Sequence, residues 1–124
     1  YFVYGSGDSA RVMTPKLTGT LLPGITRESL LTVAQDLGIG VDEGEITVAE
    51  LRAGCESGEI TEVFACGTAA VITPVGHVKS RLNGSFEVDG GTTGAITLAL
   101  RDALLDIQSG KVPDRHNWMH ALVD

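Results

Sequence analysis

Basic residues are scarce in this sequence, and they do not cluster. Nine Lys and Arg stand against sixteen Asp and Glu among 124 residues, which gives a formal net charge of −7. A protein surface that binds nucleic acid needs Lys and Arg gathered against the phosphate backbone. The charge distribution therefore argues against a nucleic-acid partner.

Long apolar runs and cysteine frameworks are also lacking. No apolar stretch approaches the roughly 20 residues needed to cross a bilayer, so no membrane partner is expected. The two cysteines, Cys55 and Cys66, form neither a CxxC pair nor a dense framework, which indicates reduced thiols in a cytoplasmic protein. The 43% of apolar and 20% of charged residues are ordinary for one globular domain with a core.

Metal and nucleophile motifs are missing as well. His77, His116 and His120 lack partners at metal-ligand spacing, and no HExxH surrounds the last two. We expect no metal site, and we expect His116 and His120 on a solvated turn of a C-terminal helix. No GxSxG is present, so a serine hydrolase is not indicated. None of the three lysines has the buried context of a Schiff-base lysine.

The first forty residues are predicted to form strands around one helix. Aromatic and β-branched residues 1–4 indicate a strand, and residues 10–14 return as its hairpin partner. Residues 17–22 indicate a further strand. Behind it, apolar residues at i, i+3, i+4 and i+7 define one helix face, with Thr26 as the N-cap and Gly38 just after the last turn.

The remaining residues predict a similar mixture. A short buried strand is expected at 39–41, and the capping-box pattern of residues 47–50 begins a short helix. Two apolar strands, 62–66 and 69–75, flank Gly67-Thr68. Two further elements complete the chain: a hairpin turning at Asn83-Gly84, and a helix from about Thr93 to Ser109. Strands and helices in this order predict one α/β domain.

The segment Leu22 to Arg27 is a candidate anion site. Gly24 permits a close backbone approach, and a helix begins immediately after it. The first N–H groups of a helix have no intrahelical acceptor and lie at the positive end of the helix dipole. The hydroxyl of Thr26 adds a donor. The alternative is a helix start whose residues serve only as a cap.

The break in the strand pattern at Gly67-Thr68-Ala69-Ala70 is a second candidate. Backbone N–H groups exposed at such a break can bind a carboxylate or phosphate oxygen. The alternative is a plain β-bulge without a ligand.

Both segments resemble the branched-chain amino acid aminotransferases. Residues 22–29, Leu-Pro-Gly-Ile-Thr-Arg-Glu-Ser, are similar to the LPG[IV]TR segment of that family. Residues 62–75, Glu-Val-Phe-Ala-Cys-Gly-Thr-Ala-Ala-Val-Ile-Thr-Pro-Val, are similar to its E-x-F-x-[SC]-G-T-A-x-x-[IV]-x-P-V stretch. The spacing of these motifs, the later helix and the tail with Trp118 also match, so the resemblance covers nearly the whole chain.

The resemblance implies a fold and an activity. Residues 1–124 would form the C-terminal part of the large cofactor-binding domain of fold-type IV aminotransferases, an α/β domain whose mixed sheet is partly closed into a barrel with packed helices. The intact protein would move an amino group between leucine, isoleucine or valine and 2-oxoglutarate, with pyridoxal 5′-phosphate as cofactor. A homo-oligomer is expected, with this chain bound to the remainder of its own protein.

The resemblance also assigns roles to residues of this chain. The Schiff-base lysine is expected upstream of Tyr1, so no catalytic residue is expected here. Thr68 and Ala69 would receive the substrate carboxylate through their backbone. The expected contacts of the cofactor are Leu22, Gly24, Ile25, Thr26 and Thr68.

Three alternatives stay open on the sequence. D-amino acid aminotransferase and aminodeoxychorismate lyase share the architecture, and the residues that would distinguish them are expected upstream of Tyr1. A non-catalytic remnant that binds phosphate or the cofactor is the third.

Overall fold

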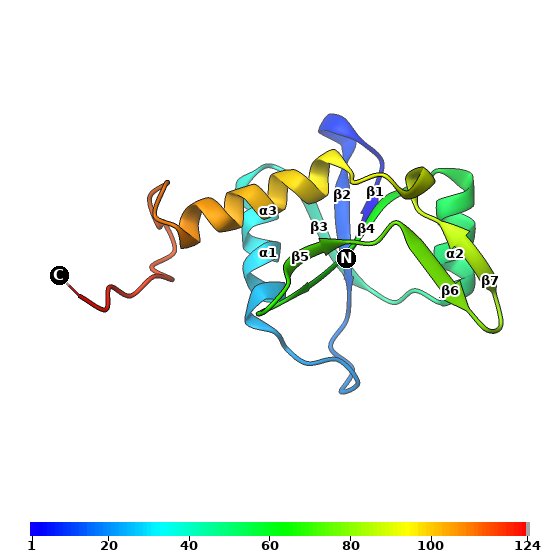
Figure 1. Ribbon diagram of the computed structural model, residues 1–124, viewed down its shortest axis with the longest axis horizontal. Coiled ribbons are helices and arrows are strands. Elements are labelled where there is room, and N and C mark those ends of the chain that lie inside the picture. The colour runs from blue at the N-terminus through cyan, green and yellow to red at the C-terminus, as the bar shows by residue number, and fades with distance from the viewer. Residues whose placement is uncertain (124) are drawn as a thin grey trace.

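The computed structural model describes residues 1–123, and an open five-stranded sheet lies at its centre (Figure 1). The strand order is β3-β2-β1-β4-β5. Only the pair β2 and β3 is parallel, while the other neighbours run antiparallel. The bounds of these strands are β1 Phe2–Tyr4, β2 Arg11–Pro15, β3 Gly40–Gly44, β4 Ile60–Gly67 and β5 Val71–Pro74.

The predicted α/β class and mixed sheet are confirmed, but no sheet within residues 1–123 closes into the predicted partial barrel. The sheet ends at β3 on one side and β5 on the other, and these two strands do not pair. Strands β6 (His77–Ser80) and β7 (Gly84–Glu87) form a separate two-stranded sheet around the predicted hairpin turn. Closure requires the two edge strands to pair with each other, and β3 and β5 are separated by the three strands between them.

Helix α1 (Ile25–Asp36) begins earlier than predicted. Its N-cap is Gly24 instead of Thr26, because the N–H of Glu28 already donates to the carbonyl of Gly24 at 3.1 Å. Its end agrees with the prediction. Gly38 has a φ of +74°, and its N–H donates to Gln35 while the next N–H donates to Ala34, which is a Schellman arrangement.

The predicted strand at 17–22 is wrong. Residues between β2 and α1 form a loop, in which the side chains of Leu17, Leu21 and Leu22 are exposed. The apolar pattern suggested a strand, but β2 already pairs on both edges, with β1 and β3. No free edge is left beside β2 for another strand.

Helix α2 (Val48–Ser57) has the predicted capping box. The hydroxyl of Thr47 accepts from the N–H of Glu50, whose carboxylate accepts from the N–H of Thr47. Helix α3 (Ala95–Gln108) has Gly94 as its N-cap. Two short 3₁₀ turns, Gly7–Ser9 and Asp89–Gly91, complete the helical segments.

The break at Gly67-Thr68 is a hairpin turn between β4 and β5, so neither a bulge nor a strand at 69–70 is present. Gly67 pairs with Val71, and the three residues between them turn the chain. The strand predicted at 39–41 exists as β3, but it is an edge strand with mostly exposed residues. Val41 alone among the apolar residues of β3 packs against the main core, and it is only partly buried.

The main core lies where α1 and α3 pack side by side against one face of the sheet (Figure 1). Fully buried side chains there include Val3, Leu30, Phe64 and Leu100. Each contributes about 1.5–3 kcal/mol relative to an exposed position. A second cluster joins Ile60 of β4 to α2 and the β6–β7 sheet. No helix within residues 1–123 is long and apolar enough to cross a membrane.

Candidate functional site

A cleft of about 650 Å³ opens between the loop before α1, the first turn of α1 and the end of β4. Figure 1 shows the β4–β5 turn lying beside the start of α1, although these segments are far apart in the sequence. The residues predicted to contact a cofactor all line this cleft: Leu22, Gly24, Ile25, Thr26 and Thr68.

Ala69 is the predicted site residue that does not line the cleft. It lies in the exposed turn after Thr68, between β4 and β5. Two segments separated by about forty positions therefore meet at one hollow, and Ala69 lies just beyond its rim.

The start of α1 presents unused backbone donors to this cleft. Glu28 is the first residue whose N–H has an intrahelical acceptor, so the N–H groups of Ile25, Thr26 and Arg27 precede the helical ladder. The N-cap Gly24 has no side chain, and no side-chain hydrogen bond caps the helix. These donors lie at the positive end of the helix dipole, which favours an anion.

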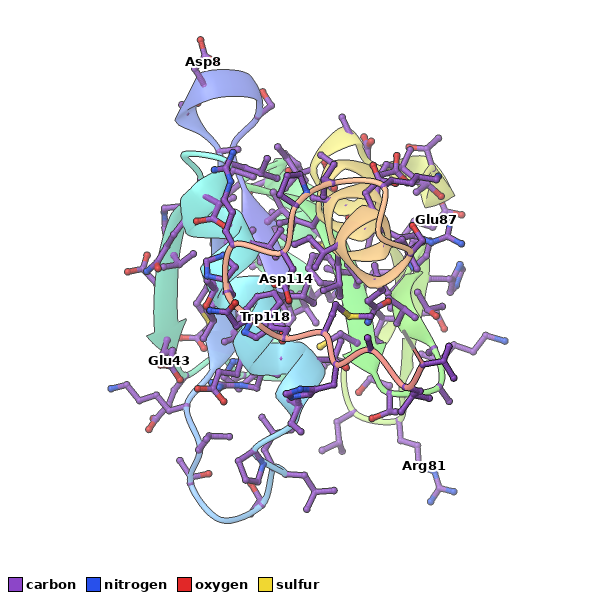
Figure 2. The ribbon with its side chains drawn as sticks, turned by 90° about the vertical axis from the view of Figure 1, so that its left-hand side faces the viewer. Asp8, Glu43, Arg81, Glu87, Asp114 and Trp118 are labelled. Atoms are coloured by element: carbon purple, nitrogen blue, oxygen red, sulfur yellow. The ribbon has the colours of Figure 1, made fainter. Side chains whose placement is uncertain are left out.

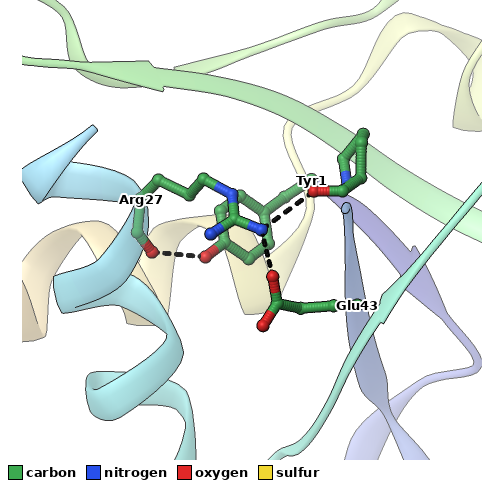
Figure 3. A network of polar contacts seen from close by, with 4 residues as sticks. Tyr1, Arg27 and Glu43 are labelled. Atoms are coloured by element: carbon green, nitrogen blue, oxygen red, sulfur yellow. Dashed lines mark hydrogen bonds and ion pairs between the residues drawn. The ribbon is translucent and has the colours of Figure 1, made fainter. Parts of the chain in front are cut away.

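Arg27 lies behind these donors, and sequence analysis missed it. Its side chain is buried, and Figure 3 shows the guanidinium reaching from α1 toward strands β2 and β3. The Nη2 atom donates to the carbonyl of Pro15 at 2.8 Å and forms an ion pair with Glu43. A cation in the first turn opposes the helix dipole. An arginine in the first turn of a predicted helix was therefore the sequence feature that could have indicated a specific role for Arg27.

Tyr1 holds the same turn from the other side. Its hydroxyl donates to the carbonyl of Arg27 at 2.6 Å (Figure 3). Its ring stacks on Phe64 with centroids 5.0 Å apart. Burial raises the pKa of the Tyr1 phenol well above its usual range, so the hydroxyl stays a donor at neutral pH.

Comparison with known proteins decides the family. The sequence pattern of the family described as amino-transferase class IV matches residues 8–78. The chain belongs to the class IV aminotransferases.

Relatives in this family include a probable branched-chain-amino-acid aminotransferase of Streptomyces coelicolor. It is 57% identical over 122 residues, which are 98% of this chain and 32% of the relative. The chain thus spans about a third of the length of the curated relatives it matches. The family resemblance inferred from the two motifs is confirmed.

Solved structures of this family have the same fold. The branched-chain amino acid aminotransferase of Escherichia coli aligns with a TM-score of 0.78 at 29% identity, over 99% of this chain and 37% of that chain. A further branched-chain amino acid aminotransferase, solved with pyridoxamine 5′-phosphate, aligns with a TM-score of 0.70 at 28% identity, over 96% of this chain and 34% of that chain.

Cys66 also lines the cleft of this class IV aminotransferase chain. Both Cys66 and Cys55 are free thiols in the structure. Burial raises the pKa of the Cys66 thiol above its usual value, so it is protonated at neutral pH. A protonated thiol is a poor nucleophile, and Cys66 packs, partly buried, against the main core.

The predicted C-terminal helical turn with His116 and His120 is wrong. The chain after α3 is irregular and crosses α1 and α3, where Figure 2 labels Asp114 and Trp118. The Nε2 atom of His116 lies 2.7 Å from a carboxylate oxygen of Asp36, and its ring stacks on Trp118. These contacts attach the tail to α1, and residues 111–123 themselves form no helix.

Proposed function

We propose that the full-length protein is a pyridoxal-phosphate-dependent transaminase of branched-chain amino acids. It moves an amino group between leucine, isoleucine or valine and 2-oxoglutarate. This chain supplies the phosphate side of the cofactor pocket. The observation that carries the proposal is the convergence of Ile25, Thr26 and Thr68 on one cleft at the open start of α1.

The donor set of the cleft suits a phosphate group. A phosphate monoester carries close to two negative charges near neutral pH and three strong acceptor oxygens. The backbone N–H groups of Ile25 and Thr26 and the hydroxyls of Thr26 and Thr68 supply four donors for these oxygens, and the positive end of the helix dipole favours the negative charge. Gly24 leaves room for close approach, since a Cβ built there has no neighbour nearer than 3.9 Å.

The apolar part of the cleft suits the cofactor ring. The side chain of Leu22 is 86% exposed and lines the cleft, which leaves it free to pack against a planar aromatic ligand. The N–H groups of Thr68 and Ala69, at the β4–β5 turn, would bind the carboxylate of the amino acid. The cofactor, when bound, supplies the electron sink for the reaction, while this chain binds and orients it.

Branched-chain substrates are favoured over the other activities of this fold. The matching proteins from Streptomyces coelicolor and Escherichia coli carry the branched-chain name, which supports that substrate class over D-amino acids or a lyase reaction.

Together with the family resemblance, the two free thiols support a cytoplasmic location. A homo-oligomer is proposed on the resemblance.

The test uses the full-length protein with pyridoxal 5′-phosphate, L-glutamate and each branched-chain 2-oxo acid in turn. We expect the matching L-amino acid to form, measured by chromatography, and no product when cofactor is removed. D-glutamate replaces L-glutamate in a control that identifies a D-amino acid aminotransferase. Absence of product with all three oxo acids would contradict the proposal.

A further inference from the structure

Arg27 occupies a position where its charge is costly. It lies in the first turn of α1, where the helix dipole disfavours a cation. The residue is only 8% exposed, and burying a charge requires compensation by partners. A long neutral side chain would fill this position without either cost, so the charge has a reason other than packing.

Arg27 joins the start of α1 to strands β2 and β3 and to the residue before β1. Its guanidinium contacts Pro15 at the end of β2 and Glu43 in β3. Its carbonyl accepts from Tyr1, which precedes β1 (Figure 3). The first turn of α1 is therefore held in place relative to the sheet, whose strand β4 ends at the Thr68 side of the cleft.

The charge of Arg27 is incompletely balanced. The side chain of Glu43 is 47% exposed, whereas that of Arg27 is 10% exposed, so solvent screens the carboxylate more than the guanidinium. Both contacts use the same nitrogen, Nη2. The Nε atom is buried and has no hydrogen-bond partner among residues 1–123. A positive charge thus remains behind the donors of Ile25 and Thr26.

We propose that Arg27 is a positioning residue for the phosphate of the cofactor. It holds the N–H groups of Ile25 and Thr26 in place and adds positive charge behind the bound anion. Its Nε is too deeply buried to contact a ligand, so it acts through the helix start and through its field. This inference rests on the proposed function, since it concerns the phosphate group that the cleft binds.

The experiment compares two ligands that differ only in the phosphate. Dissociation constants of pyridoxal 5′-phosphate and pyridoxal are measured by absorbance in the full-length protein and in Arg27→Met, Arg27→Lys and Arg81→Met. Arg81 is the matched control, because it is exposed and projects from the β6–β7 turn in Figure 2. Arg81→Met removes the same unit charge far from the helix start.

Arg27→Met should weaken pyridoxal 5′-phosphate about tenfold and pyridoxal by less than about twofold, because only the first ligand carries the anion. Arg27→Lys should give an intermediate loss, since it keeps the charge but cannot bridge Pro15 and Glu43 with one planar group. Arg81→Met should change neither constant. Equal losses for both ligands, or no loss for either, would overturn the inference.

Two further measurements keep the outcome interpretable. Circular dichroism of the cofactor-free proteins checks that each variant folds. If Arg27→Met does not fold, the affinities of Arg27→Lys for the two ligands test the role of Arg27.

If the parent protein fails to bind pyridoxal 5′-phosphate, the proposed function is wrong, but the role of Arg27 can still be tested. Titration with inorganic phosphate, followed by ³¹P NMR, then compares parent and Arg27→Lys: weaker phosphate binding in the variant supports the role of Arg27, and equal binding refutes it.

Discussion

The starts of α1 and α3 use the same local arrangement for two different purposes. Each helix has a glycine N-cap in extended conformation, Gly24 or Gly94, and neither N-cap carries a side-chain cap. At α3 the carboxylate of Glu62 accepts from Ile96 and Thr97 at 3.0 and 2.7 Å. At α1 the residues at the equivalent positions, Thr26 and Arg27, line the cleft.

The difference shows what separates a structural helix start from a candidate binding site. Both ends attract an anion because unpaired N–H groups and the helix dipole coincide there. At α3 the protein supplies that anion from β4, and the buried Glu62 occupies the space beside Gly94. At α1 no side-chain cap is present among residues 1–123, and in the proposed function the phosphate of the cofactor takes the corresponding place.

The largest expected effect comes from Gly94→Ala, which places a methyl group where the carboxylate of Glu62 lies at the start of α3. A Cβ on Gly94 would lie 1.9 Å from the carboxyl carbon of Glu62. Gly94→Ala should therefore expel the carboxylate and destabilise the protein by about 3 kcal/mol, measured by thermal unfolding. Gly24→Ala is the matched control and should cost within about 1 kcal/mol, because the site has room and an ordinary φ. Similar losses in the two variants would remove the distinction between the helix starts.

A smaller effect is expected from removing one donor at α1. Thr26→Val deletes the hydroxyl of a residue that lines the cleft and should weaken the binding of pyridoxal 5′-phosphate about five- to tenfold, measured by absorbance titration. Thr32→Val is the control, since Thr32 belongs to the same helix but lines a different groove. An equal loss in both variants would show that helix propensity, and not the hydroxyl, determines affinity.

Helix α2 extends the comparison to a start that is capped by its own side chains. Thr47→Ala removes the hydroxyl that accepts from Glu50 and should cost about 1 kcal/mol in the free energy of unfolding. Cofactor affinity should not change, because neither residue lines the cleft. A loss of cofactor binding in this variant would contradict the assignment of the site to α1.

The smallest expected effect is a pH dependence at the same cap. The backbone N–H and hydroxyl of Thr47 lower the pKa of Glu50 below its usual value. The carboxylate therefore stabilises the fold fully above its unfolded pKa of about 4.3, and this contribution is lost as pH falls through the lower folded pKa. The unfolding temperature of Thr47→Ala should decline less than that of the parent when the pH falls from about 5 to about 3.

Local signals were sufficient for the ends of several elements. The capping box at Thr47 and the glycine after α1 were predicted correctly, because both depend on hydrogen bonds within a few residues. The prediction of Thr26 as N-cap failed by two positions. A glycine N-cap lacks the side-chain signal on which such a prediction depends.

Nonlocal contacts account for the remaining errors. The apolar segment 17–22 resembled a strand, but it pairs with neither edge of the sheet and its leucines stay exposed. The role of Arg27 depends on Pro15 and Glu43, which lie on two other strands. No pattern along the chain relates these positions, so the network was not predicted.

The sequence by itself determined the chemistry available at the cleft: glycine and threonine at a helix start, and threonine after a β-strand. Those features follow from residue type and spacing, which act locally. Only the tertiary structure decided that Thr26 and Thr68 line one cleft and that Glu62 occupies the start of α3 instead of α1. Strand pairing and helix packing bring distant residues together, and these depend on the whole core.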